Sequence, residues 1–262
     1  MKNVKQNLEL LYDYVMKLEE KYKFLPTFEF RTQEISYEDK QLEDSIKKDV
    51  LAKTISLFEY DKLPKIVSDD IYEKMNSINF KNQGVKVFNS ELFRGVRNIN
   101  HHANTLFDKK YHIGLGDVCN GLYATQNFQT AFVYTNCTSE DLVLCMKIPD
   151  MRIIDNLTLV CDVQNAFSNN KPTTDENVAI LNEIVDFVNL IEDPIKRSKF
   201  LYAFLSDLSI VAIFLGYDAV FDTNFPSYAI FNRGKICVSK SQSDKIKRLA
   251  NFCQEQEPIQ KQ

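Results

Sequence analysis

The sequence predicts an α+β fold in which helices come first and grouped strands follow. Up to about residue 80, apolar residues recur only at helical spacing. Short β-type runs begin near residue 85, and they do not alternate one by one with helices as a parallel βαβ sheet requires. The apolar share of 44% and the charged share of 26% are those of an ordinary globular protein. These observations favour one mixed core preceded by a helical segment.

Length and composition narrow the class further. A chain of 262 residues can bury one large core, or one core with a small helical module beside it. The net charge of -4 argues against a dedicated nucleic-acid coat, although a local basic groove is compatible with it. The six cysteines form neither a Cys-x-x-Cys pair nor a zinc-type cluster with histidine, so we expect reduced thiols and no metal. No apolar run reaches the length of a membrane span, and the start lacks a signal-peptide core, so we expect a cytoplasmic protein away from membranes.

The first third of the chain predicts three helices. Apolar residues recur at helical spacing over residues 4–23 and again over residues 39–58. Pro26 ends the first of these segments, because proline cannot continue a helix. A short helix is expected over residues 69–77, with Ser68 as its N-terminal signal.

Strand-like runs follow. We expect strands at residues 85–88 and 91–94, then a glycine-punctuated loop over residues 114–125 that enters a further strand. A short helix over residues 128–134 starts behind Thr125 or Asn127. Two more strands are expected, at residues 141–148 and 151–155.

The last third predicts two helices, then strands, then a basic tail. The helices cover residues 175–191 and 194–215, with Pro194 near the start of the second and Gly216 as its C-cap. The expected strands are 217–221, 228–232 and 235–239, and Asn232-Arg233-Gly234-Lys235 resembles a hairpin turn. Residues 240–250 form a basic helix, and residues 254–262 are expected to be disordered.

One window combines residue types that suit a nucleotide. Arg94 at a strand end can hold a diphosphate with paired, charge-assisted bonds. Gly95 lets its backbone approach a flat ring and bond an amide on that ring, and Thr125 can fix a ribose hydroxyl. Tyr123 and Tyr134 can stack on the two faces of the ring. Taken singly these residues indicate a surface ion pair and core tyrosines, but together they describe the nicotinamide half of NAD.

The other motifs in the sequence say less about function. The chain has no P-loop, no Gly-x-Ser-x-Gly and no His-Glu-x-x-His. Residues 114–116 read Gly-Leu-Gly but lack the third glycine of a dinucleotide fingerprint, so a flexible loop is the better interpretation. His101, His102 and His112 fall on the predicted loop over the NAD site, where we interpret them as polar loop residues rather than acid/base groups.

Five segments in this order resemble the ADP-ribosyltransferase family, which includes bacterial mono-ADP-ribosylating toxins and poly-ADP-ribose polymerases. The resemblance spans about residues 85–240, and its order and spacing are more specific than any single motif. The matching segments are Leu92-Phe93-Arg94-Gly95-Val96 for the first-strand Tyr-Arg-Gly, Asn120-Gly121-Leu122-Tyr123-Ala124-Thr125 for the Gly-x-Tyr-(Phe/Ser)-(Ser/Thr) strand, Gln129-Thr130-Ala131-Phe132-Val133-Tyr134 for the Ala-x-x-Tyr helix, Leu215-Gly216-Tyr217-Asp218-Ala219-Val220 for the Gly-Tyr-Asp element, and Ser227-Tyr228-Ala229-Ile230-Phe231-Asn232 for the Tyr-Val-Val-Phe-Asn strand.

The resemblance implies split mixed and antiparallel sheets, in a domain that we place at residues 81–250. The helical periodicity before it predicts a helical module over 1–80, and residues 251–262 are expected to form a disordered tail. It implies mono-ADP-ribosyl transfer from NAD, as co-substrate, to a protein or nucleic acid. Such a protein would be a toxin or effector, in the cytoplasm or delivered into another cell. By this resemblance Arg94 would bind a phosphate or the nicotinamide ribose, Gly95 would pair with the carboxamide, and Tyr123 and Tyr134 would flank the ring. Thr125 would take the place of the family's strand threonine, although Ala124 and Gln126 replace the serines beside it.

The sequence departs from the family at the catalytic acid. The family begins the Tyr-Val-Val-Phe strand with a glutamate that stabilises positive charge as the glycosidic bond breaks. Ser227 stands at that position here, and the nearest acid, Asp222, lies five residues earlier. Asp218 falls in an element that is more often structural. Either Asp222 takes the place of the glutamate, or another acid reaches into the site, or transfer of ADP-ribose is weak or absent. In the first case the catalytic candidates are Arg94, Tyr134 and Asp222.

Two alternatives stay open. The chain would be a catalytically inactive module of the same fold that binds NAD, ADP-ribose or a protein, or it would be an NAD glycohydrolase. The acceptor is not specified, although five basic residues keep nucleic acid open. The N-terminal helices would be a recognition arm or a docking surface for an antitoxin or regulatory partner. The five basic residues are Lys235, Lys240, Lys245, Lys247 and Arg248.

Overall fold

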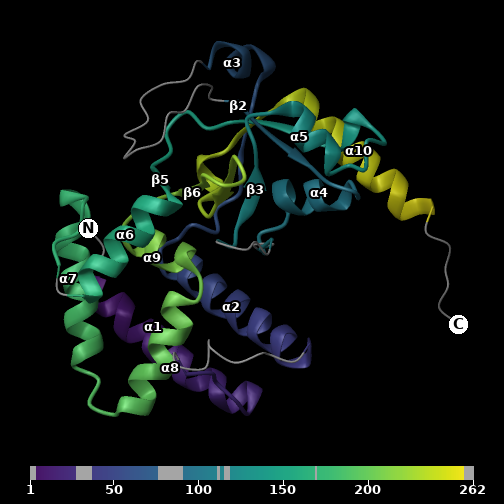
Figure 1. The fold of residues 1–262 in the computed structure, drawn as a ribbon. Coiled ribbons are helices and arrows are strands. Elements are labelled where there is room, and N and C mark those ends of the chain that lie inside the picture. Colours follow the sequence, from purple (N-terminus) through teal and green to yellow (C-terminus); the bar gives the residue numbers. More distant parts are fainter. Residues whose placement is uncertain are drawn as a thin grey trace, which may run out of the picture.

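The chain divides into a helical half and a half built on two sheets (Figure 1). Helices α1, α2, α7, α8 and α9 gather in one half, and the sheets lie in the other with α3, α4, α5 and α10 around them. The computed structural model describes residues 4–27, 37–75, 91–110, 113–114, 119–168 and 170–256.

The described residues contain these helices. In chain order they are α1 (Val4–Tyr22), α2 (Tyr37–Leu57), α3 (Asp69–Lys74), α4 (Asn100–Phe107), α5 (Phe128–Val133), α6 (Asn156–Phe167), α7 (Asp175–Asn189), α8 (Pro194–Leu205), α9 (Leu208–Phe214) and α10 (Lys240–Gln256).

The described strands form two four-stranded mixed sheets. Sheet A has the order β1-β8-β4-β2, with β1 parallel to β8 and the other pairs antiparallel. Sheet B has the order β3-β7-β6-β5, with only β5 and β6 parallel. The α+β prediction is confirmed at this level. The strands are β1 (Lys65–Val67), β2 (Glu91–Gly95), β3 (Leu122–Ala124), β4 (Val143–Lys147), β5 (Ile153–Asp155), β6 (Ala219–Asp222), β7 (Ser227–Ile230) and β8 (Cys237–Ser239).

Sheet B separates two apolar cores. Val220 and Ala229 face a core shared with α1, α2 and α6 to α9. The neighbouring residues Ala219 and Tyr228 face a second core, which sheet A, α4 and α10 complete. Successive side chains of a strand point to opposite faces, so strands this short can serve two cores at once. Both faces of sheet B are therefore covered.

The N-terminal helices belong to the first of these cores. The predicted helical periodicity is confirmed for α1 and α2, whose Leu8, Leu11 and Val50 are fully buried. Helix α1 packs against α2, α7 and α8. The predicted module boundary at residue 80 falls outside the described residues, so the division into 1–80 and 81–250 stays a prediction.

Some elements were not predicted. Helix α4 stands where a loop was expected, and α6 follows β5 directly. Strand β1 has only three residues and pairs with β8, so that each residue lies opposite one 172 positions later in the chain (Lys65 opposite Cys237, Ile66 opposite Val238). The helix predicted over 194–215 is interrupted after α8, because the buried carboxylate of Asp207 accepts the backbone N–H of Ser209 and caps a new helix, α9. Gly216 follows α9 with φ of +80°, as the C-cap prediction requires.

The predicted hairpin at residues 232–235 is wrong. The strands on either side, β7 and β8, belong to different sheets, and a 3-10 helix, Arg233–Lys235, connects them. The side chain of Arg233 is buried, whereas a hairpin turn would expose it. Its guanidinium donates to the backbone carbonyls of Asp61, Thr105 and Asp108, and also to that of Lys109. This buried fork fixes the path of the connection.

The C-terminal helix is longer than predicted, and some predicted segments lie outside the described residues. Helix α10 continues to Gln256, six residues past its expected end at 250, so the expected tail is helical up to that residue. The strand expected at 85–88, residues 257–262 and His112 lie outside the described residues. Within the described part of the chain, no helix has both the length and the apolar character that a membrane span needs.

Candidate functional site at the junction of the two sheets

In the described part of the chain, a backbone bridge between Phe93 of β2 and Thr125, the residue after β3, joins the two sheets. The N–H of Phe93 donates to the Thr125 carbonyl over 2.7 Å, and the Thr125 N–H returns a bond of 2.9 Å. This bridge brings the Arg94-Gly95 end of β2 beside the end of β3. Two of the five segments that carry the sequence resemblance therefore meet here.

Arg94 is held at this junction by a backbone carbonyl. The side chain is half-buried, and Nη1 donates to the carbonyl of Tyr123 over 3.1 Å. A guanidinium is planar, so fixing one nitrogen also sets the direction of the remaining donors. The strand end therefore presents an oriented arginine fork at the seam between the sheets.

His102 stands close to Arg94, and its position corrects the loop prediction. His101 and His102 lie on α4, and His102 is fully buried with Nε2 3.0 Å from the carbonyl of Leu142. Burial, reinforced by the positive charge of Arg94, lowers the pKa of His102 to about 3. The imidazole is thus neutral near pH 7 and takes part in packing rather than covering a site.

Gly95 is required by packing, whatever binds nearby. A Cβ atom at this position would lie 1.7 Å from the carbonyl oxygen of Ala131 in α5 and 3.1 Å from Cβ of Tyr134. Helix α5, capped by the Asn127 side chain, therefore rests directly on the β2 backbone. The close approach predicted for Gly95 exists, but a helix makes it.

Tyr123 and Tyr134 occupy different surroundings. The hydroxyl of Tyr123 donates to the carbonyl of Cys119, and its ring packs on the first core. Tyr134 follows α5 and is 65% exposed. The described residues show no ring contact between the two tyrosines. Of the pair predicted to flank a ring, Tyr134 is the one that is open to solvent.

Thr125 ties β3 to the residue before β7. Its hydroxyl donates to the carbonyl of Pro226 over 3.0 Å and accepts the N–H of Asn127 over 3.2 Å. The β3–β7 pairing ends with Ala124 opposite Tyr228, so Thr125 and Ser227 are the next residue on each strand. The serine at the expected glutamate position therefore lies at the junction, beside the threonine of the same motif set.

Asp222 belongs to the same cross-strand row but is one strand further away. It pairs with Ser227 across β6 and β7, and directly opposite residues of an antiparallel pair point to the same face. Two strand spacings of about 4.8 Å put Asp222 about 10 Å from Thr125. The row Thr125–Ser227–Asp222 thus brings an acid toward the junction without bringing it next to the bridge.

The Asp222 carboxylate is fixed by neighbours that the sequence did not indicate. Oδ1 accepts the amide of Asn156 over 3.2 Å and the N–H groups of Asn224 and Phe225 over 2.9 and 3.4 Å. Asn156, at the start of α6, is buried, and its Oδ1 accepts both the N–H and the hydroxyl of Thr223. The sequence did not predict α6, and only the tertiary fold brings Asn156 to the β6–β7 turn. This contact could therefore not be predicted.

Asp218 has a structural role, as the sequence suggested. Its carboxylate accepts the N–H of Arg152 over 2.8 Å and the side-chain amide of Asn232 over 2.7 Å. Burial disfavours the charged carboxylate and raises the pKa of Asp218, whereas the two hydrogen bonds act in the opposite direction. Among the described residues, no group of three or more His, Cys, Asp or Glu side chains is arranged to hold a metal ion.

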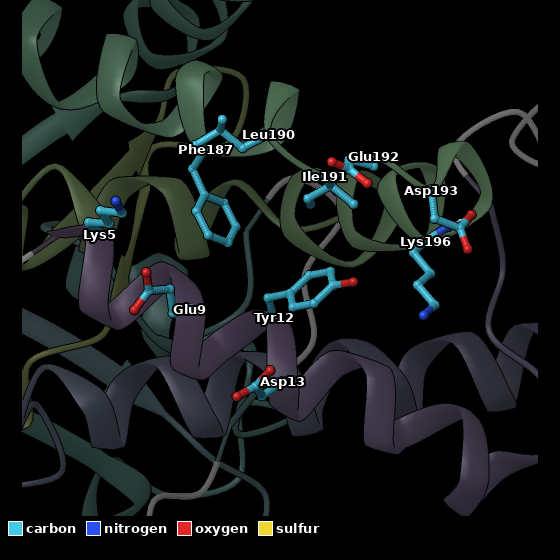
Figure 2. Close-up of a pocket in the computed structure, with 10 residues that line it drawn as sticks. All are labelled: Lys5, Glu9, Tyr12, Asp13, Phe187, Leu190, Ile191, Glu192, Asp193 and Lys196. Carbon is cyan, nitrogen blue, oxygen red and sulfur yellow. Dashed lines mark hydrogen bonds between the residues drawn. The ribbon is translucent and has the colours of Figure 1, made fainter.

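A concave surface lies elsewhere, between α1 and the α7–α8 connection (Figure 2). This open groove has a volume of about 490 Å³, and none of the junction residues lines it. Comparisons with family models, with curated proteins and with solved structures found no match. The resemblance to ADP-ribosyltransferases therefore rests on this chain's own residues.

Proposed function

We propose that the chain is a mono-ADP-ribosyltransferase that uses NAD and modifies a macromolecular acceptor. The Phe93–Thr125 bridge carries the proposal, because it joins segments that the sequence resemblance assigned to one nucleotide site. Two contacts between distant segments support the proposal: Arg94 bonds to the carbonyl of Tyr123, and Thr125 bonds to the carbonyl of Pro226, the residue before Ser227.

The chemistry divides among the junction residues. The oriented guanidinium of Arg94 would pair with the diphosphate, and the exposed ring of Tyr134 would stack on the nicotinamide. In the reaction the nicotinamide–ribose bond breaks with its electron pair leaving on nicotinamide, and an acceptor nucleophile bonds to the ribose carbon and releases its proton to solvent. Asp222 is the acid of the row that would face the developing positive charge. Water in place of the acceptor gives NAD hydrolysis.

A second candidate, a non-catalytic NAD or ADP-ribose-binding module, is favoured by one specific feature. Ser227 occupies the middle of the row, and it has no negative charge to offer. The nearest acid, Asp222, uses Oδ1 to hold the β6–β7 turn through Asn156 and two backbone amides. Under this reading NAD binds at the junction but its glycosidic bond stays intact.

Turnover separates the two candidates. We expect purified protein to release nicotinamide from NAD, measured by chromatography, and Arg94→Ala to abolish the release because the diphosphate loses its cation. Arg97→Ala is the matched control, since Arg97 is exposed three residues away. Asp222→Asn keeps the size of the side chain and removes its charge. Release that survives Arg94→Ala would contradict the proposal, and binding without release would favour the second candidate.

The acceptor is identified by the product. Incubating a cell lysate with protein and labelled NAD, then analysing the protein and nucleic-acid fractions by mass spectrometry, would locate the transferred ADP-ribose. We expect label in one fraction with the wild type and in neither with Arg94→Ala. Label that appears equally with both proteins would show transfer by another enzyme.

A further inference from the structure

The groove between α1 and the α7–α8 connection has an apolar floor. Tyr12, Phe187 and Ile191 line it, and the ring of Tyr12 contacts that of Phe187 edge-on with centroids 6.3 Å apart. In Figure 2 both rings point into the space between the helices. The groove is open to solvent, and its volume of about 490 Å³ leaves room for a large side chain. Leu190 at the edge is 70% exposed, so the apolar surface continues out of the groove.

The walls of the groove are acidic. Glu9 and Asp13 stand one turn apart on α1, and Glu192 and Asp193 belong to the opposite wall. All four side chains belong to exposed residues. Lys5 and Lys196 stand near the two ends of the groove in Figure 2, which leaves the middle flanked by carboxylates. An apolar floor between carboxylates fits an aromatic or aliphatic side chain with a basic neighbour.

Helix α10 exposes that combination. Phe252 is 57% exposed, and Arg248 lies one helical turn before it on the same face, with Lys247 alongside. Ile246 and Ala250 bury the opposite face in the second core. Within the described residues neither Arg248 nor Lys247 takes part in an ion pair. The side of α10 that faces solvent is therefore basic and carries one free aromatic ring.

We infer that α10 of one copy docks into the α1/α7–α8 groove of a second copy. The two surfaces lie at opposite ends of the molecule in Figure 1, so a chain cannot satisfy its own groove. Phe252 would enter between Tyr12 and Phe187, and Arg248 and Lys247 would face the carboxylates of the walls. A membrane is the poorer occupant for α10, because its apolar face is already buried and only Phe252 remains to insert.

Such contacts are head-to-tail. After two copies associate, the helix of one copy and the groove of the other remain unoccupied. Contacts of this kind form rings or open chains rather than closed two-fold dimers. Because the partners are charged and exposed, association should weaken as salt rises. The inference is independent of NAD.

Sedimentation equilibrium of the full chain tests it. We expect the wild type to associate with rising concentration at low salt. The helix variant, Arg248→Glu with Phe252→Ser, should weaken the association at least tenfold, and so should the groove variant, Glu9→Lys with Asp13→Lys. Asp70→Lys with Glu73→Lys on α3 makes the same charge change away from the groove and should leave association unchanged.

Mixing the two variants gives the sharpest outcome. Each is expected to be monomeric alone, but the helix variant keeps a groove and the groove variant keeps a helix. Their mixture should form a one-to-one heterodimer and nothing larger. A monomeric wild type at high concentration and low salt would overturn the inference, and so would a mixture that stays monomeric while the wild type associates.

Discussion

Arg94 and Gly95 occupy the point where the sheets join, and each is fixed by backbone. The guanidinium bonds to the carbonyl of Tyr123, and the glycine Cα lies against the carbonyl of Ala131. Both residues were singled out from the sequence as nucleotide contacts. Each residue also has a structural role that needs no ligand. A loss of activity in a Gly95 variant would therefore not by itself identify Gly95 as a ligand contact. Arg94 is the better probe of function.

Replacing Gly95 by alanine should destabilise the protein without any ligand. A methyl group 1.7 Å from a backbone oxygen cannot be accommodated unless α5 moves. Overpacking of this kind costs about 1–3 kcal/mol and sometimes more. Gly234→Ala is the control, because its nearest neighbour, Cβ of Lys62, is 3.0 Å away. Urea unfolding monitored by circular dichroism measures both; equal losses would contradict the packing of α5 on β2.

His102 should make stability depend on pH. Its pKa of about 3 in the folded protein lies below the ordinary value of 6.5, so the unfolded chain binds a proton first as pH falls. The stabilisation is complete above about pH 6.5 and is lost progressively toward pH 3, by at most about 1.4 kcal/mol per pH unit. His102→Gln keeps a donor for the Leu142 carbonyl but does not titrate.

The measurement is the unfolding free energy of wild type and His102→Gln at pH 7, 6, 5 and 4. We expect the wild type to lose more stability than the variant over this range. Parallel pH profiles would mean that the folded imidazole takes up its proton as readily as the unfolded one.

At the scale of elements, Asp207 decides where one helix becomes two. Its carboxylate is buried and accepts the N–H of Ser209 and both the N–H and the side-chain amide of Asn120. The hydroxyl of Ser209 returns a bond to the carbonyl of Asn120. The cap of α9 thus also anchors the segment that leads into β3.

Asp207→Ala should cost roughly 2–4 kcal/mol, because it removes a helix cap together with the buried carboxylate that accepts two N–H groups of Asn120. Asp193→Ala is the matched control: Asp193 caps α8 in the same way but is exposed, and about 1 kcal/mol is expected. Thermal unfolding of the two variants measures the difference. If both lose the same amount, the contact with Asn120 contributes nothing.

The elements that the sequence predicted well are those with a strong local signal. Helices α1 and α7 follow apolar periodicity, and α5 starts at Asn127, whose side chain accepts the N–H of Thr130. Helix α4 was missed because Asn-His-His-Ala-Asn-Thr is poor in helix-forming residues, and tertiary packing of buried Leu106 overrides that preference. The β1–β8 pair has no local signal at all, since its partners are distant in sequence.

The sequence likewise predicted some residues of the candidate site and missed others. Arg94 and Thr125 could be named because a motif order pointed to them, and the bridge brings their segments together. Asn156 could not be named, because its bond to Asp222 exists only once α6 is placed beside the β6–β7 turn. The separation of Asp222 from Thr125 by the width of β7 depends on strand order, which spacing in sequence does not give.

For the whole molecule, Arg233 connects parts that are far apart in the chain. Its Nη2 donates to the carbonyls of Asp61 and Lys109 over 3.1 Å each, and Nη1 donates to those of Thr105 and Asp108. One buried cation therefore holds the segment after α2, the end of α4 and the β7–β8 connection together. Sequence alone suggested an exposed turn residue at this position.

Arg233→Met should be among the most damaging single changes, at about 3–5 kcal/mol, because four backbone carbonyls lose the buried guanidinium that bonds them. Arg97→Met replaces an exposed arginine and should stay within about 0.5 kcal/mol. Denaturant unfolding compares them. A small effect of Arg233→Met would mean that water replaces the guanidinium at those carbonyls.

Calorimetric titration of NAD tests whether the junction beside Arg94 is the proposed NAD site. We expect saturable binding to the wild type. We expect at least about tenfold weaker binding, 1.4 kcal/mol, to Arg94→Lys, because lysine cannot pair with a diphosphate through two parallel bonds. Arg97→Lys should bind as the wild type does. No binding heat with folded wild type, or equal affinity for the wild type and Arg94→Lys, would contradict the proposal.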